Sequence, residues 1–184
     1  LLAERPAPRM VLAAGDAPVV MGLGSALPKV AAPLYRMVVS ACLALGQRAL
    51  LVGCDAEQLG ELGESPQVHT VSWAPYEPLF ARAAAVVHHG GIGSSAAALR
   101  SGNPSVILAF GNDQHDNGFR SADNGVGVWL PKRRASRSRV TKALVQCLED
   151  EVTRKCSREL AESILAEPAG EERAVELVLA KAAR

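Results

Sequence analysis

The stretch VVHHGGIGSSAAALRSG, residues 86–102, decides the fold. It begins with an apolar run that ends in two histidines, passes through three glycines and two serines, and then becomes rich in alanine. The apolar run predicts a buried strand, and the alanine-rich part predicts a helix over 94–101 that Gly102 ends. The stretch is therefore expected to form a strand, a tight glycine turn and a helix.

Short apolar runs and helical segments alternate in this way along most of the chain. The apolar runs show no alternation with polar residues, which is typical of strands that are buried on both faces of a parallel sheet. The sequence therefore predicts an α/β domain with a doubly wound, Rossmann-like parallel sheet. The predicted strands cover 18–23, 48–53, 67–71, 85–88, 105–109 and 126–130; the predicted helices cover 29–45, 77–82, 94–101, a segment after the polar loop 111–118, and 138 to the end with a break at 167–170.

Composition excludes several classes of protein. The 184 residues carry a formal net charge of +1, so neither nucleic acid nor a membrane surface is an expected partner. No apolar run approaches the ~20 residues that span a bilayer, and no signal peptide is visible at the start. The cysteines lack the spacing of a zinc site, so we expect reduced thiols in the core and a cytoplasmic protein. They are Cys42, Cys54, Cys147 and Cys156.

Two segments stand outside the predicted core. Residues 1–16 contain prolines and charges and lack an initial Met, which indicates the remnant of an interdomain linker, with the domain proper over 17–184. The basic run KRRASRSR, residues 132–139, is expected to be a solvated loop.

The glycine turn has the chemistry of an anion site. Ligands of doubly wound sheets bind at the carboxyl ends of the strands, where the loops 22–25, 72–76, 88–95 and 111–117 are expected. Gly90, Gly91 and Gly93 let the backbone approach a ligand closely, and Ser94 and Ser95 fall at the start of a helix whose dipole attracts anions. Phosphate is the expected occupant, and a serine-capped turn without a ligand is the alternative.

The two histidines are expected to have different roles. Neighbours in a strand point to opposite faces, so only one of them can face a ligand. We expect His89 to donate to a phosphate oxygen and His88 to be held within the scaffold. The GxGxxA pattern from Gly91 also weakly matches a dinucleotide fingerprint, although that fingerprint belongs to the first βα unit of a domain.

Two further loops offer ligand contacts. Trp73 in SWAPY could stack on a flat base, or else pack in the core. Asp113 and Gln114 could bind the hydroxyls of a sugar, or else cap the next helix. No cluster of histidines and carboxylates with metal-ligand spacing is apparent, so no metal is implied.

These segments together resemble one family. The chain is similar to the C-terminal, nucleotide-sugar-binding half of a family 1 glycosyltransferase of the GT-B fold, especially to bacterial rhamnosyltransferases and to sterol or antibiotic glycosyltransferases. The segments that carry the resemblance are VVMGLGSA (19–26), the run from 72 to 108, and FGNDQHDNG (110–118).

The resemblance implies a role for each matching residue. Trp73 would flank a uracil or thymine base, His89, Gly91, Gly93 and Ser94 would hold the diphosphate, and Asp113 with Gln114 would hold the sugar. Ser25 matches a serine of the first loop at the interdomain cleft. Plant members have a glutamate at the position of Ala97 and a glutamine at that of Tyr76, so the choice between UDP and dTDP stays open.

The implied reaction is an inverting, metal-independent transfer of a hexosyl group from a UDP- or dTDP-sugar, with no cofactor beyond that donor. The general base is expected in an N-terminal acceptor-binding domain, so this chain alone is expected to bind the donor and to be almost inactive. Alternatively, the chain is a stand-alone donor subunit that needs a separate acceptor-binding partner. A nicotinamide-dependent oxidoreductase module is the third interpretation, and it rests on GxGxxA alone.

Overall fold

The fold is a single parallel sheet covered by helices. The computed structural model describes residues 12, 15–24, 31–167 and 170–182. Six strands form one sheet in the order β3-β2-β1-β4-β5-β6, and every neighbouring pair is parallel. The predicted fold class and all six predicted strands are confirmed. The strands are β1 (Val19–Gly22), β2 (Ala49–Val52), β3 (Val68–Val71), β4 (Ala85–His88), β5 (Ser105–Ala109) and β6 (Gly127–Pro131).

The order of the strands places a switch point at the centre of the sheet. The chain builds outward from β1 through β2 to β3 and then returns to add β4 on the other side of β1. Gly22 at the end of β1 pairs with His88 at the end of β4. The loops that leave these two strands therefore start side by side, at the position where doubly wound sheets bind their ligands.

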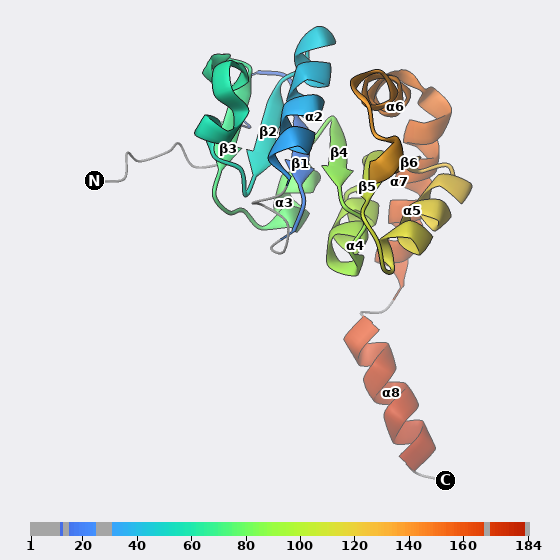
Figure 1. Ribbon diagram of the computed structural model, residues 1–184. Helices are drawn as coiled ribbons and strands as arrows, with labels where there is room; N and C mark the ends of the chain where they lie inside the picture. Colours follow the sequence, from blue (N-terminus) through green and yellow to red (C-terminus); the bar gives the residue numbers. More distant parts are fainter. Residues whose placement is uncertain (1–11, 13–14, 25–30, 168–169, 183–184) are drawn as a thin grey trace.

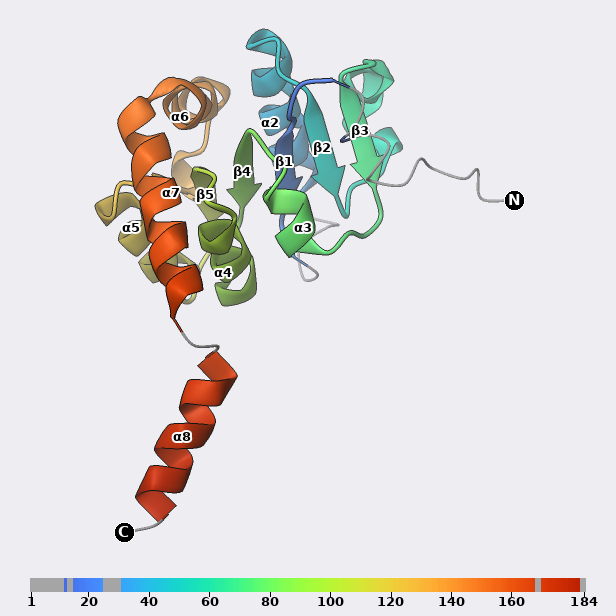
Figure 2. The same cartoon turned by 180° about the vertical axis from the view of Figure 1, so that it is seen from behind.

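The helices cover the two faces of the sheet (Figures 1 and 2). One apolar cluster joins Val19, Met21 and Leu51 to α2 (Ala32–Ala44) and α6 (Arg137–Glu149). A second cluster joins Val20, Leu50 and Val86 on the other face to α3 (Tyr76–Phe80) and α4 (Ile92–Ser101). Successive strand residues thus supply opposite clusters, which explains why the strands are apolar without a break.

The C-terminal region is helical, as predicted. Helix α7 (Glu151–Ala166) packs against α4, whereas α8 (Gly170–Ala182) projects away from the sheet and its helices (Figure 1). The predicted break between them is confirmed, and Asp150 makes a further break between α6 and α7 by capping α7 through its carboxylate. Gly102 ends α4 in the left-handed conformation, with φ +70°, as its position predicted.

Some expected loops are helical. Helix α5 (Gln114–Asp123) includes most of the predicted polar loop, because its polar residues lie on an exposed face while Gly118 packs under the Trp129 ring of β6. The basic run is also ordered: it forms the short 3₁₀ helix η2 (Lys132–Arg134) and the start of α6, where Ser136 is the N-cap. A further 3₁₀ segment, η1 (Ala56–Glu64), was not predicted.

Other expectations have mixed outcomes. Helix α2 begins at Ala32, and residues 29 and 30, where the predicted helix starts, lie outside the described part. All four cysteines are free thiols, as expected. Residues 1–11, 13 and 14 are not described, so the linker stays a prediction, although Leu12 packs against the cluster of α3 and α4.

Candidate functional site

The turn after β4 is held by His88. Its Nδ1 atom accepts a hydrogen bond from the backbone N–H of Gly90, two residues along the chain, at 3.1 Å. Gly90 has φ +89°, and a Cβ at this position would lie 2.8 Å from Ile107 and 2.9 Å from the carbonyl oxygen of Gln114. Only glycine fits this conformation and this space, so the turn packs directly against the start of α5.

His88 is a scaffold residue, as the sequence predicted. The side chain is fully buried, and burial lowers its pKa to about 3, with a smaller effect from His89. The ring is therefore neutral at pH 7, with Nδ1 as the acceptor and the proton on Nε2.

His89 lies between two glycine backbones that come from different strands. A Cβ at Gly24, after β1, would lie 2.8 Å from His89 Cε1, and a Cβ at Gly91, after β4, would collide with His89 Nε2. The imidazole thus occupies the switch point of the sheet. Its Nδ1 atom is buried and has no hydrogen-bond partner among the described residues. A buried ring nitrogen without a partner is uncommon in folded proteins, which singles out His89 among the residues of this edge.

The charge state of His89 follows from its surroundings. Burial lowers its pKa, and the carboxylate of Asp113 opposes this effect. The free site therefore holds a neutral imidazole at pH 7, which donates one hydrogen bond and accepts one. An arriving anion would favour the charged ring.

Helix α4 begins beside His89. Gly91 is the N-cap, so the helix starts two residues before its predicted position. The amides of Ile92, Gly93 and Ser94 belong to the first turn, where backbone N–H groups have no partner within the helix. Ser94 and Ser95 lie at the start of the helix, as expected, but both side chains are buried, and Ser95 Oγ has no partner among the described residues.

A cavity of about 420 Å³ lies at the carboxyl ends of β1, β2 and β3. Its wall includes Gly24, the same glycine that contacts His89, together with Trp73 and Tyr76. The Trp73 side chain is 74% exposed, which rules out the alternative that it packs in the core. A large exposed indole at the rim of a mainly apolar cavity is suited to stack on a flat ring.

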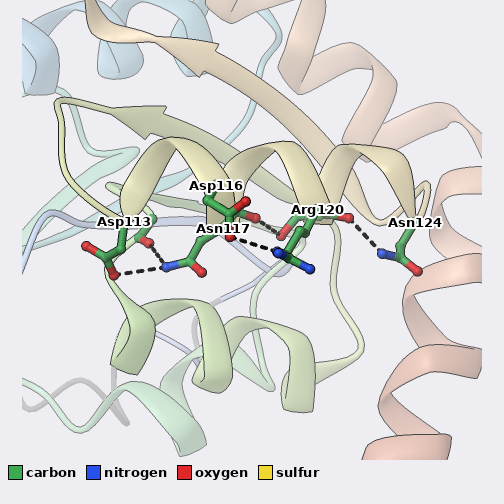
Figure 3. A network of polar contacts seen from close by, with 7 residues as sticks. Asp113, Asp116, Asn117, Arg120 and Asn124 are labelled. Atoms are coloured by element: carbon green, nitrogen blue, oxygen red, sulfur yellow. Dashed lines mark hydrogen bonds and ion pairs between the residues drawn. The ribbon is translucent and has the colours of Figure 1, made fainter.

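The start of α5 borders the glycine turn from the other side. Asn117 Nδ2 donates both to the carbonyl oxygen of Gly90, at 2.8 Å, and to Asp113 Oδ2, at 3.1 Å. Asp113 is the N-cap of α5 and Asn117 lies in the first turns of the helix. Asp116, Arg120 and Asn124 form a second set of contacts, which continues to the end of the helix (Figure 3). Asn117 thus ties the exposed carboxylate of Asp113 to the turn that carries His89.

Asp113 and Gln114 do not both point their side-chain oxygens toward a ligand, as the sequence had predicted. Gln114 Oε1 accepts from the amides of Phe110, at 2.8 Å, and Gly111, at 3.4 Å. This side chain therefore holds its own loop, while the carboxylate of Asp113 stays exposed. The alternative that these residues cap the next helix is not confirmed, because the N-cap Asp113 makes no side-chain cap hydrogen bond. Asn112, which immediately precedes Asp113, has φ +53°. This conformation is uncommon for residues other than glycine and is often found at functional sites.

The structure brings most of the predicted residues to one edge. His89, Gly91 and Asp113 meet around the glycine turn, and Trp73 is joined to them through Gly24. Gly93 follows in α4, but a Cβ there would meet no atom within 4 Å. Ser25 lies outside the described residues.

Sequence reasoning assigned no contact to three residues of this edge. Gly24, Tyr76 and Asn117 lie in the loops 22–25, 72–76 and 111–117 that were expected there, but none of them was given a role. A glycine after the first strand was the available signal for Gly24. The contacts of Tyr76 and Asn117 join segments 52 and 27 residues apart, which local patterns do not reveal.

Neither a cluster of metal-ligating side chains nor a membrane-spanning helix is found in the part of the chain that the structure describes. No group of three or more His, Cys, Asp or Glu side chains in this part is arranged to hold a metal ion. Among the described helices, none has the length and apolar character needed to cross a membrane.

Comparison with known proteins identifies the family and the fold. Residues 38–179 match the family model of the erythromycin biosynthesis protein CIII-like C-terminal domain. A sterol 3-beta-glucosyltransferase of Emericella nidulans is 32% identical over 156 residues, which cover 81% of this chain and 11% of that protein. The glycotransferase of kitacinnamycin superposes with a TM-score of 0.77 at 28% identity, over 96% of this chain and 44% of that one.

A second solved structure shares the fold. The glycosyltransferase VinC, solved in complex with dTDP, has a TM-score of 0.77 at 23% identity, over 95% of this chain and 44% of its own. The chain thus spans less than half the length of these solved relatives and about a tenth of the curated one. The chain belongs to the erythromycin biosynthesis protein CIII-like C-terminal domain family, and it has the fold of the C-terminal domain of family 1 glycosyltransferases of the GT-B type.

Proposed function

We propose that this domain binds the donor of an inverting, metal-independent glycosyltransferase that moves a hexosyl group from a UDP- or dTDP-sugar to a small-molecule or lipid acceptor. One observation carries the proposal: His89 lies between Gly24 and Gly91 at the switch point of the sheet, beside the first turn of α4 and next to the cavity that Trp73 lines. The names of the curated relatives, sterol 3-beta-glucosyltransferases, support a hexosyl donor and a lipid acceptor.

The diphosphate would lie at the start of α4. The first-turn amides of Ile92, Gly93 and Ser94 and the positive end of the helix dipole favour an anion there. His89 would add a hydrogen bond from its ring. As the bond to the anomeric carbon breaks, negative charge grows on the departing diphosphate, and these fixed donors stabilise it without rearranging.

The base and the sugar would lie on either side of the diphosphate. Trp73 would stack on the uracil or thymine ring over the cavity. The exposed carboxylate of Asp113 would accept hydrogen bonds from sugar hydroxyls, whereas Gln114 has only its amide nitrogen to offer, because Oε1 holds the loop. The general base would come from an acceptor-binding domain of the same enzyme or from a separate subunit, so the domain alone would bind donor with little turnover.

Isothermal titration calorimetry tests the proposal. The domain is titrated with UDP, dTDP, their glucose and rhamnose conjugates and NAD, in the presence of EDTA so that no metal assists. We expect a nucleoside diphosphate to bind and NAD not to bind. His89→Ala should weaken binding by about 1–3 kcal/mol, the range for a hydrogen bond to a charged group.

A matched control separates a ligand contact from a general effect of losing a histidine. His69 is the second residue of β3 and does not line the cavity, so His69→Ala should leave the affinity unchanged. Binding of NAD alone, or equal losses in both alanine variants, would contradict the proposal.

A further inference from the structure

Tyr76 connects the base cavity to the turn after β1. It is the first residue of α3, its ring lines the cavity beside Trp73, and it stacks on Phe80 with 4.7 Å between ring centroids and 14° between planes. Its hydroxyl oxygen accepts a hydrogen bond of 3.3 Å from the backbone N–H of Gly24. The stacked and half-buried ring leaves this hydroxyl little freedom to move.

The sequence of β1 is fitted to this contact. A Cβ at Gly22 would lie 2.5 Å from the Tyr76 hydroxyl, so only glycine allows the ring to reach the end of the strand. A second tyrosine acts from the opposite face of the sheet, mainly on the neighbouring strand: Tyr35 of α2 donates to the carbonyl oxygen of Val52, the last residue of β2, at 2.8 Å and interacts with the amide of Leu23. The two tyrosines thus hold the adjacent ends of β1 and β2.

The position of the Gly24 backbone limits the position of the His89 ring. The imidazole lies so close to Gly24 that a Cβ there would be 2.8 Å from Cε1. Tyr76 therefore acts on His89 through one residue of backbone: the hydroxyl holds the Gly24 amide, and Gly24 limits where the imidazole can lie.

We propose that Tyr76 is a positioning residue for His89, which sets the distance between the base cavity and the diphosphate turn through the amide of Gly24. The role of His89 toward the ligand rests on the function proposed above, but the contact between Tyr76, Gly24 and His89 exists without any ligand. The first experiment therefore uses the free domain.

The first experiment follows the Cε1–H resonance of His89 by NMR in the free domain, with its assignment taken from the His89→Ala spectrum. Tyr76→Phe keeps the stacked ring and removes only the hydroxyl. Tyr35→Phe is the matched control, because it removes a tyrosine hydroxyl that binds Val52 at the end of the neighbouring strand β2 and makes no hydrogen bond with the Gly24 amide. We expect the resonance to shift in Tyr76→Phe and to stay in place in Tyr35→Phe.

The second experiment measures the coupling in binding. Tyr76→Phe should raise the Kd for UDP about fivefold, the usual effect of one hydrogen bond, and by less than twofold when His89 is already alanine. An unmoved His89 resonance, equal shifts in both tyrosine variants, or the same loss of UDP affinity in both His89 backgrounds would overturn the inference. If the unaltered domain binds no nucleotide, the proposed function fails, and the NMR result alone decides the role of Tyr76.

Discussion

His88 Nδ1 and the backbone N–H of Gly90 form a hydrogen bond that closes the turn between β4 and α4. The bond requires a neutral ring, because a protonated imidazole has no acceptor atom. The fold of the site is therefore linked to pH through a residue that does not face the ligand.

This link predicts a loss of stability in acid. The pKa of His88 falls from its usual 6.5 to about 3 in the folded domain. The unfolded chain then binds the proton more readily, so the contribution is complete above pH 6.5 and is lost as the pH falls toward 3. The slope for one such group is about 1.4 kcal/mol per pH unit. In His88→Asn, whose Oδ1 can accept from Gly90, denaturant unfolding should show a weaker loss between pH 6.5 and 4.5; parallel curves for the two proteins would contradict the assignment.

The affinity for a UDP-sugar should rise as the pH falls. Burial lowers the pKa of His89 in the free domain, and a bound diphosphate would raise it, so binding takes up a proton. The Kd should therefore decrease from pH 8 toward pH 5.5, by at most about tenfold per pH unit. UDP-glucose is the ligand to use, because its phosphates do not titrate in this range. In His89→Gln the dependence should vanish, and a dependence that survives would assign the proton elsewhere.

Trp73 should report the nucleotide by fluorescence. Its side chain is 74% exposed, whereas the other tryptophan, Trp129, is half-buried against Phe119 in an edge-to-face contact of 6.2 Å. Trp129→Phe gives a protein whose emission comes from Trp73 alone. UDP should change that emission, and Trp73→Ala should weaken binding by about 1–3 kcal/mol, the range for stacking one base on an aromatic ring. If calorimetry shows that UDP binds but the Trp73 emission does not change, the base does not stack on Trp73.

Substitution by alanine should have different effects at Gly91 and Gly93, although both glycines were given the same role from the sequence. A methyl group at position 91 would collide with the His89 ring, whereas one at position 93 would enter open space. Gly91→Ala should therefore displace the His89 resonance, while Gly93→Ala should leave it in place. Because alanine favours a helix over glycine, Gly93→Ala should also raise the free energy of unfolding by up to about 1 kcal/mol. Similar spectra for the two variants would show that Gly91 does not confine the ring.

Substitution of Asp113 should affect ligand binding, whereas substitution of Gln114 should affect stability. Gln114→Ala removes the acceptor of the Phe110 and Gly111 amides and should lower the free energy of unfolding by about 1–3 kcal/mol. Asp113→Asn should leave stability nearly unchanged and weaken UDP-glucose more than UDP, since only the former carries the sugar. Thermal unfolding and calorimetry of both variants test this, and equal losses for the two ligands would remove Asp113 from the sugar site.

The sequence by itself determined the fold class and the edge of the sheet that carries the site. Unbroken apolar runs predicted strands buried on both faces, because only a parallel sheet covered by helices buries every strand side chain. The same reasoning placed Trp73, His89 and Asp113 at one edge, since the carboxyl ends of parallel strands meet there. Opposite faces for neighbouring strand residues also predicted that His88 would be structural.

Only the tertiary structure decided which side chains contact one another at that edge. Local patterns could not show that Gln114 turns back to its own loop, or that helix formation brings Asn117 to the Gly90 carbonyl. Nor could they show that the Tyr76 hydroxyl reaches the Gly24 amide 52 residues away, or that Gly24 in turn confines His89. The physical reason is that these positions depend on how β1, β3 and β4 are ordered across the sheet, and strand order is set by packing between distant segments.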